Sequence, residues 1–380
     1  MVGQSSNVQV QEGLEGVIAG QSSICYIDGV KGRLLYRGYD VADLAGQATF
    51  EEVAYLLWHG DLPTRSALGE LKSQLLAAAD LPGPAADVLK RIPVGAHPMA
   101  VLRTMISVLA HFDPDAEDHS QAANARKAVR LTAQVPAVVA GFERTRRGQA
   151  VVSPRPDLSH AGNYLYMMHG SPPDPEAARA LDVALILHAD HEFNASTFAA
   201  RVTAATLSDL HSAIVSAVGT LKGPLHGGAN EEVMRLLERI GTVERVEPVI
   251  AEMLASGKKI PGFGHRVYKT EDPRARFLRA LSQRMGERAG DLRWYQLTRQ
   301  VEEVTTARRK IHPNVDLYSA SFYRALAIPG DLYTATFAVS RIAGWTAHVL
   351  EQYADNRLIR PLSEYVGPQD RRYVPLEARG

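Results

Sequence analysis

From residue 50 onward, apolar residues recur every three or four positions along most of the chain. This spacing places them on one face of an α-helix, and it is the main sequence signal for helical structure. It predicts helices over 50–60, 64–80, 98–112, 117–147, 175–192, 194–219, 229–255, 272–309 and 331–353. Short turns rich in glycine and proline separate them. The predicted fold class is therefore all-α.

The one convincing strand region comes before the helices. Residues 22–40 alternate in polarity around Asp28-Gly29 and Lys31-Gly32, which is typical of a short β-hairpin. Further on, glycine and proline cluster at 219–228 and at 329–330. These clusters bracket a helical segment, which we expect to form a separate lobe inserted into the rest of the chain. A cleft that closes at such a hinge is a common place for a ligand.

Composition limits the class of protein. The 380 residues are 46% hydrophobic and 22% charged, which suits a globular chain long enough for two domains. The 42 basic and 42 acidic residues cancel, so no overall field favours nucleic acid or an anionic membrane as a partner. A single cysteine, Cys25, excludes an intrachain disulfide framework. We find no targeting signal and no apolar run of membrane-spanning length, and we expect a cytoplasmic protein.

Two histidines follow glycine-containing turns, where the backbone can approach a ligand closely. His226 lies in KGPLHGGAN (222–230), where Asn230 has the pattern of the cap of the next helix. His265 lies in GFGHRVYKTEDPR, directly after the turn at 262–264. The alternative for the first segment is a tight connection in which the histidine plays no part.

Asp272 and Pro273 have the pattern of the cap and first residue of a helix, which places Arg274 in its first turn. A cation there opposes the helix dipole by ~0.3–1 kcal/mol. That cost is reasonable if Arg274 and the free backbone N–H groups share an anion. An exposed arginine that tolerates the cost is the alternative.

Two further charged residues stand in unusual places. Asp316 follows a Pro-Asn turn at the head of an apolar helix, where an ordinary N-cap aspartate would also belong. Arg341 shares an apolar helix with Trp345 and His348, and the adjacent turns hold no acidic residue before Glu351. A buried arginine needs a partner, which is here either distant in sequence or a bound carboxylate.

His188 and His191 lie three residues apart, with Glu192 beside them. One hypothesis is a metal site, as in a metallohydrolase, although the order H-x-x-H-E is not a known zincin order. The other is that His191 donates a hydrogen bond to a polar substrate. Together with the loop-borne His226, His265 and Asp316 and the buried arginines, the second hypothesis suits a small substrate with several negative charges.

GPLHGGAN, GFGHRVYKTEDPR, PNVDLYSA, and SRIAGW followed by NRLIRP resemble the citrate synthase family in their order and spacing, as do SHAGNYLYM and LHADHEFNAST upstream. The resemblance runs from about residue 22 to residue 367. It implies an almost wholly helical homodimer with a short N-terminal hairpin. It also implies a large domain of residues 1–227 and 328–380 and an inserted small domain of residues 228–327 that closes over the cleft.

The resemblance implies a reaction as well: oxaloacetate condenses with acetyl-CoA, and the thioester is then hydrolysed, as in the first step of the tricarboxylic acid cycle. CoA is then a product, and no metal or tightly bound cofactor takes part. Asp316 matches the base that removes a methyl proton, and His226 matches the donor to the thioester oxygen. His265 matches the group that polarises the ketone. A neutral His226 is reasonable beside a helix N-terminus.

The remaining matches concern binding. His191, Arg274 and Arg341 resemble the cradle of the dicarboxylate. Arg360 resembles an arginine that reaches into the partner subunit's site, Lys269 a cation near the CoA phosphates, and Gly262, Phe263 and Gly264 the backbone that meets the adenine. Propionyl-CoA, the substrate of 2-methylcitrate synthases, remains an alternative to acetyl-CoA.

Overall fold

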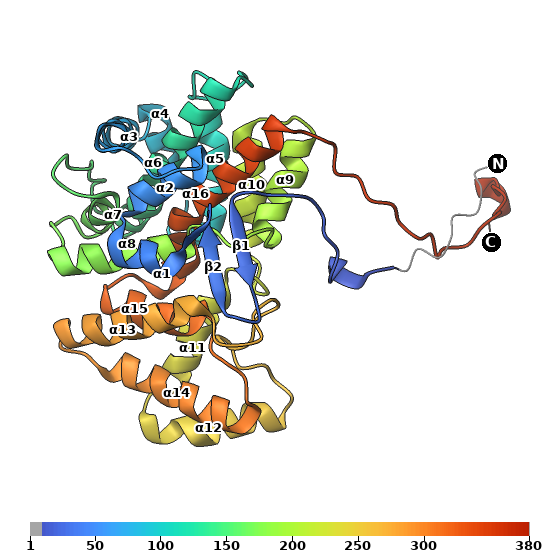
Figure 1. Ribbon diagram of the computed structural model, residues 1–380. Coiled ribbons are helices and arrows are strands. Elements are labelled where there is room, and N and C mark those ends of the chain that lie inside the picture. Colours follow the sequence, from blue (N-terminus) through green and yellow to red (C-terminus); the bar gives the residue numbers. More distant parts are fainter. Residues whose placement is uncertain (1–9, 380) are drawn as a thin grey trace.

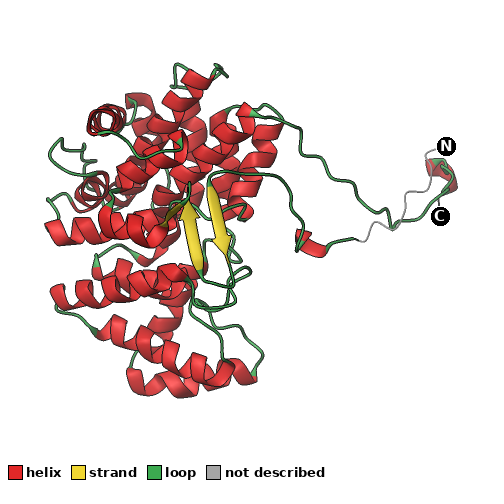
Figure 2. Ribbon diagram, viewed as in Figure 1, coloured by secondary structure: helices red, strands yellow, loops and turns green. Residues whose placement is uncertain are grey.

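The structure, a computed structural model, describes residues 10–379. Within this range the chain forms sixteen α-helices and one small sheet, which confirms the all-α prediction (Figures 1 and 2). Eleven of the helices make up one group: α1 (Val41–Gln47), α2 (Phe50–His59), α3 (Arg65–Ala78), α4 (Gly83–Arg91), α5 (Pro98–Ala110), α6 (Gln121–Arg146), α7 (His160–His169), α8 (Pro175–His188), α9 (Ala195–Ala205), α10 (Leu210–Leu221) and α16 (Tyr333–Ala354). The second group lies below it in Figure 1 and consists of α11 (Ala229–Ile240), α12 (Val246–Ala255), α13 (Pro273–Arg288), α14 (Arg293–Arg309) and α15 (Val315–Ala325).

Three of the segments predicted as single helices are pairs of helices. The break between α9 and α10, within 194–219, contains Leu207 with φ of 63°. Gly241, with φ of 76°, lies between α11 and α12, and Gly290, with φ of 67°, lies between α13 and α14. A residue in a left-handed conformation cannot continue a right-handed helix, so each of these positions ends one. The apolar spacing did not reveal the breaks because both helices of a pair use the same period.

The predicted hairpin is present as β1 (Cys25–Asp28), β2 (Arg33–Tyr36) and a short β3 (Tyr39–Asp40). The strands pair antiparallel in the order β1-β2-β3, with Cys25 opposite Tyr36. The hairpin turn reaches the loop that carries His265, because the Gly29 carbonyl accepts a hydrogen bond from the Lys269 N–H at 2.8 Å. A Cβ atom on Gly29 would lie 2.3 Å from the Val267 carbonyl oxygen, so only glycine permits this approach.

The helix α16 forms the centre of the first group. Every residue from Tyr333 to Val349 is buried, so this helix is covered on all sides. Even so, none of the helices within residues 10–379 combines the length and apolar character needed to cross a membrane. At Gly344, α16 touches the end of α8: a Cβ atom there would lie 2.3 Å from the Ala189 carbonyl oxygen.

Gly344→Ala is expected to destabilise the protein by about 1–3 kcal/mol, because the added methyl group overlaps backbone atoms that cannot move independently. Gly69 in α3 is the matched control, since a Cβ atom there meets nothing within 4 Å. Gly69→Ala should be neutral or stabilising by up to about 1 kcal/mol, because alanine is the better helix former. Denaturant unfolding measures both changes, and equal stabilities of the two variants would contradict this description of the α8–α16 contact.

Candidate active site

A cleft of about 750 Å³ brings together side chains from segments that are far apart in the sequence. Six of the predicted site residues line it, from both helix groups: His191, His226, His265, Arg274, Asp316 and Arg341. The other predicted residues lie elsewhere. Arg360 and Lys269 are exposed outside the cleft, and the backbone of 262–264 forms the loop before His265.

Asp316 lies in the first turn of α15, but it does not cap that helix. The cap is Asn314, whose Oδ1 accepts a hydrogen bond from the Asp316 N–H at 3.0 Å, so the N-cap alternative for Asp316 is wrong. Asn314 is held in turn by the carbonyls of Gly262 and Gly264, each at 2.9 Å. Gly262 has φ of 83°, and a Cβ atom there would lie 2.9 Å from Leu317, so glycine is required. The carboxylate of Asp316 therefore takes no part in capping α15 and is available to a ligand in the cleft.

Arg274 pairs with the residue that caps its own helix. Asp272 accepts the Arg274 N–H at 3.0 Å and also receives the guanidinium, Nε at 2.9 Å and Nη2 at 2.7 Å. Both side chains are buried, so the alternative of an exposed Arg274 is wrong. Burial lowers the pKa of Arg274, but the ion pair outweighs that effect and holds the pKa above its ordinary value. The adjacent carboxylate offsets the unfavourable helix dipole.

Asp316 has an environment that opposes its charge. Burial raises the pKa of Asp316 to about 7, although the nearby Arg274 and Arg341 act in the opposite direction. A carboxyl group that titrates near neutral pH can accept a proton at pH 7 more effectively than an ordinary aspartate can. This is the property required of a general base.

The cleft holds His226 in a neutral form. The pKa of His226 is lowered to about 4, first by burial and then by the charge of Arg341. Its Nε2 lies 2.8 Å from the Ser196 Oγ and accepts the Ser196 backbone N–H at 3.3 Å. Because a backbone N–H can only donate, we assign the ring proton to Nδ1, which leaves one N–H for a ligand. Trp345 holds Ser196 in place through a 3.0 Å hydrogen bond from its Nε1.

One expectation about this loop, the cap of the helix that follows it, needs correction. The N-cap of α11 is Gly228, and Asn230 lies buried in the first turn. A Cβ atom on Gly227 would lie 2.4 Å from the Leu221 side chain, so glycine is required at this position. Without a side chain, residue 227 can pack directly against the end of α10. The lowered pKa of His226 has burial as its first cause and the charge of Arg341 as its second, and it agrees with the expected neutral ring.

His191 and His265 lie together, with ring centroids 5.0 Å apart. His265 Nδ1 accepts the backbone N–H groups of Val267 at 3.0 Å and Tyr268 at 3.1 Å, which leaves its ring proton on Nε2. Burial and then Arg274 lower the pKa of His265 to about 4, and the same two causes hold that of His191 well below its ordinary value. His191 Nε2 lies 3.3 Å from the Tyr268 hydroxyl.

The residues proposed as metal ligands, His188, His191 and Glu192, do not form a metal site. The helix α8 ends at His188, whose Nδ1 lies 2.7 Å from the Ala184 carbonyl oxygen, so His188 and His191 do not share a helical face. The His188 ring packs edge-on to Phe337, with centroids 4.9 Å apart. Between residues 10 and 379, no three histidine, cysteine, aspartate or glutamate side chains cluster as a metal site requires.

Arg341 is the most unusual cation of the cleft. It is 1% exposed, and its Nε donates to the His188 carbonyl at 2.7 Å. Among the residues that the structure describes, no carboxylate lies within 4 Å of its guanidinium. Burial lowers the pKa of Arg341 to about 10, an effect that the more distant Asp190 opposes. A buried guanidinium without an adjacent carboxylate is stabilised when a ligand carboxylate binds to it, so Arg341 is a candidate binding group for such a ligand.

Sequence reasoning missed the residues that orient the others. Ser196, Tyr268 and Asn314 contact His226, His191 and Asp316 respectively. The Pro-Asn turn could have indicated Asn314 as a cap. Ser196 and Tyr268 carry no local signal, because their contacts depend on residues 30 and 77 positions away.

Asp316→Asn should become more stable relative to the wild type as the pH rises from 6 to 8. The pKa of Asp316 in the folded protein, about 7, exceeds the ordinary value of 3.8, so the folded state binds this proton more tightly than the unfolded state does. The stability from that proton is fully present below about pH 4 and is lost as the pH rises through about 7. Asparagine has no such proton. Melting temperatures at both pH values measure the difference, and a constant or shrinking difference would contradict the raised pKa.

Comparison with known proteins identifies the family of the chain. A family model described as the citrate synthase C-terminal domain matches residues 13–362. Citrate synthase 2 of Bacillus subtilis (strain 168) is 51% identical, over 97% of this chain and 98% of its own. The 2-methylcitrate synthase of Shewanella oneidensis is 41% identical, over 97% of each chain.

A solved structure agrees as well. The citrate synthase of Thermoplasma acidophilum, described as a ternary complex with carboxymethyl coenzyme A and oxaloacetate, superposes with a TM-score of 0.92 at 33% identity. The superposition covers 98% of this chain and 100% of that one. Since sequence and fold match over nearly the whole length, and the predicted side chains meet in one cleft, the chain belongs to the citrate synthase family.

Proposed function

We propose that the chain condenses acetyl-CoA with oxaloacetate and hydrolyses the resulting thioester to citrate and CoA, with Asp316, His226 and His265 as catalytic residues. The observation that carries the proposal is the meeting of these three groups with two buried arginines in one cleft. Membership of the family supports the reaction, and the ternary complex of the Thermoplasma relative supports oxaloacetate and a CoA thioester as substrates.

In this proposal Arg274, Arg341 and His191 bind oxaloacetate. The fork of Arg341 suits one carboxylate, and Arg274 lies on the same cleft for the other. The Nε2–H of His265 donates to the ketone oxygen, which draws electron density from the ketone carbon. A neutral imidazole suits this role because it donates a proton in a hydrogen bond without adding a further positive charge.

The chemical steps use the two remaining groups. The Asp316 carboxylate removes a proton from the methyl carbon of acetyl-CoA, while the Nδ1–H of His226 donates to the thioester oxygen, where negative charge develops. The methyl carbon then forms a bond to the ketone carbon, and the ketone oxygen takes up a proton. Water finally attacks the thioester carbonyl, and the CoA thiol leaves.

We also propose the two-domain division that the resemblance implies, with residues 228–327 as a small domain. The five helices α11 to α15 fall in this range and lie together in Figure 1, which supports it. Cleft residues come from both sides of the division, so a closing movement would enclose the substrates. Lys269 and the backbone of 262–264 lie on the small-domain side, where CoA would bind.

The segment after α16 supports a homodimer. Residues 355–379 extend away from the helical body (Figure 1), and Leu358, Leu362 and Val366 are between 58% and 90% exposed. Apolar side chains on an extended segment are stabilised by a second surface that covers them. Arg360 lies on this segment outside its own cleft, so we propose that it completes the cleft of the partner subunit.

Wild-type protein mixed with oxaloacetate and acetyl-CoA should release free thiol. Asp316→Asn should reduce the rate at least about 100-fold, because the carboxylate that accepts the methyl proton is absent. Oxaloacetate should still bind to this variant, as titration calorimetry measures. Propionyl-CoA serves as the comparison substrate: thiol release with propionyl-CoA alone would make the chain a 2-methylcitrate synthase, and release with neither would refute the proposed reaction.

Mixing the inactive Arg360→Ala and Asp316→Asn chains should restore activity. If Arg360 acts in the partner's cleft, one cleft of each hybrid dimer has both intact residues, and a randomly mixed population regains roughly a quarter of the wild-type rate. The rate of thiol release after co-expression measures this. If the mixture stays as inactive as its components, each cleft is built from one chain.

A further inference from the structure

The turn that carries His191 into the cleft is held from behind by buried polar groups. Its carboxylate, Asp190, is 0% exposed, and its Oδ2 accepts both the Glu192 N–H at 3.2 Å and a hydrogen bond from His348 Nε2 at 3.2 Å. The backbone carbonyl of Asp190 accepts the Tyr36 hydroxyl at 3.0 Å. Glu192 adopts φ of 55°, an unusual conformation for a residue other than glycine, so this turn depends on its contacts.

The direction of the hydrogen bonds follows from the chemistry of arginine. Arg201 Nη1 lies 3.1 Å from His348 Nδ1, and a guanidinium can only donate. Nδ1 of His348 is therefore the acceptor, and the ring proton is on Nε2, facing Asp190. His348 is 0% exposed, so no water replaces this donor. The N–H donor of Arg201 thereby fixes the tautomer that Asp190 needs.

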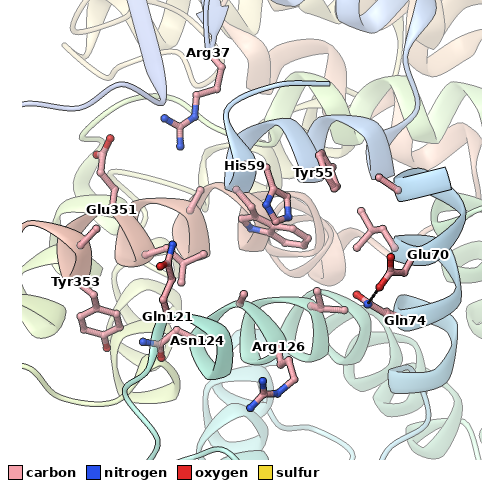
Figure 3. A pocket seen from close by; sticks show the side chains of 18 of the residues that line it. Arg37, Tyr55, His59, Glu70, Gln74, Gln121, Asn124, Arg126, Glu351 and Tyr353 are labelled. Atoms are coloured by element: carbon pink, nitrogen blue, oxygen red, sulfur yellow. Dashed lines mark hydrogen bonds between the residues drawn. The ribbon is translucent and has the colours of Figure 1, made fainter. Parts of the chain in front are cut away.

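Arg201 also links His348 to Glu351, which lies farther from the cleft. Arg201 Nη1 donates to Glu351 at 2.8 Å, and Glu351 also accepts the backbone N–H of Ser23 at 2.8 Å. Figure 3 shows Glu351 at a second hollow, of about 760 Å³, on the same helix as Tyr353. The contacts Glu351–Arg201–His348–Asp190 thus run from this hollow to the turn before His191.

A second contact from Arg201 strengthens the hold on the turn. Its guanidinium carbon lies 4.5 Å from the centroid of the Phe193 ring, and His348 meets that ring edge-on, with centroids 5.6 Å apart. Phe193 lines the cleft, whereas Arg201 and His348 do not. Asp190 before His191 is therefore held by a contact from α16, and Phe193 after it by contacts from α9 and α16.

We propose that His348 is a positioning residue for oxaloacetate: held by Arg201, it donates to Asp190 and so fixes the turn that places His191 in the cleft. His348 does not line the cleft and contacts no predicted catalytic group, so it acts through Asp190 and through its edge-on contact with Phe193. The inference rests on the proposed role of His191 in binding oxaloacetate. Small displacements of a group that orients a substrate have large effects on binding and turnover, which makes the role measurable.

His348→Leu, which removes both ring nitrogens, should raise the KM for oxaloacetate about tenfold or more and leave the KM for acetyl-CoA within about twofold. His348→Gln should restore most of the oxaloacetate affinity, because its amide N–H can reach Asp190. Thr346→Val is the matched control. Thr346 is equally buried on α16 and accepts Trp58 Nε1 at 2.9 Å, so its loss costs stability without touching Asp190. Its KM values should be those of the wild type.

The KM for each substrate comes from thiol release with the other substrate at saturation, and calorimetric titration of oxaloacetate gives the affinity directly. If His348→Leu lowers the melting temperature as Thr346→Val does but keeps the wild-type oxaloacetate affinity, the role is structural only and the proposal is overturned. If His348→Leu does not fold, Arg201→Lys decides, because lysine keeps the charge but lacks the fork. Unchanged affinity in that variant also overturns it. A wild-type protein that releases no thiol would instead refute the proposed function.

Discussion

The carboxylate of Asp272 is the constraint on which the cleft depends. It caps α13, accepts hydrogen bonds from Nε and Nη2 of Arg274, and accepts the Val315 N–H at the start of α15 at 3.3 Å. Breaking a buried ion pair by removing one partner leaves an uncompensated charge and is strongly unfavourable. The positions of Arg274 and of the residue after Val315, which is Asp316, are therefore fixed relative to one another by a single group.

Burial is the main influence on the charge of most titratable groups in the cleft, whereas the ion pair with Asp272 sets that of Arg274. Burial keeps the three histidines neutral, raises the pKa of Asp316 to about 7 and lowers that of Arg341 to about 10. With Arg274 neutralised by Asp272, Arg341 is the cation without an adjacent acid among the described cleft residues. In the proposed complex a carboxylate of oxaloacetate would supply the negative charge that Arg341 lacks. The low polarity of the cleft makes each of these interactions stronger than it would be in water.

Contacts beyond the cleft set the orientation of its histidines. Ser196 and Trp345 hold His226, backbone N–H groups orient His265, and the turn of His191 is held through Asp190. In His226 and His265 one ring nitrogen is used by the protein, which leaves the other for a ligand. The long buried helix α16 supplies Trp345 and His348 to two of these arrangements and Arg341 to the cleft itself, and its central place in the first helix group keeps them rigid.

The sequence by itself determined the helical class, the hairpin and the loops that bear chemistry, because apolar spacing, turn residues and caps such as Asp272 are local signals. It placed His226, His265, Arg274, Asp316 and Arg341 in unusual settings, and the resemblance joined them into one site. Only the tertiary structure decided how these side chains are oriented and which of them are charged. The cap at Asn314, the tautomers of the histidines, the need for glycine at Gly227 and the separation of His188 from His191 all depend on atoms brought together from distant segments. Burial, which sets the charges of the cleft, is a property of the packed chain, and no local stretch of sequence contains it.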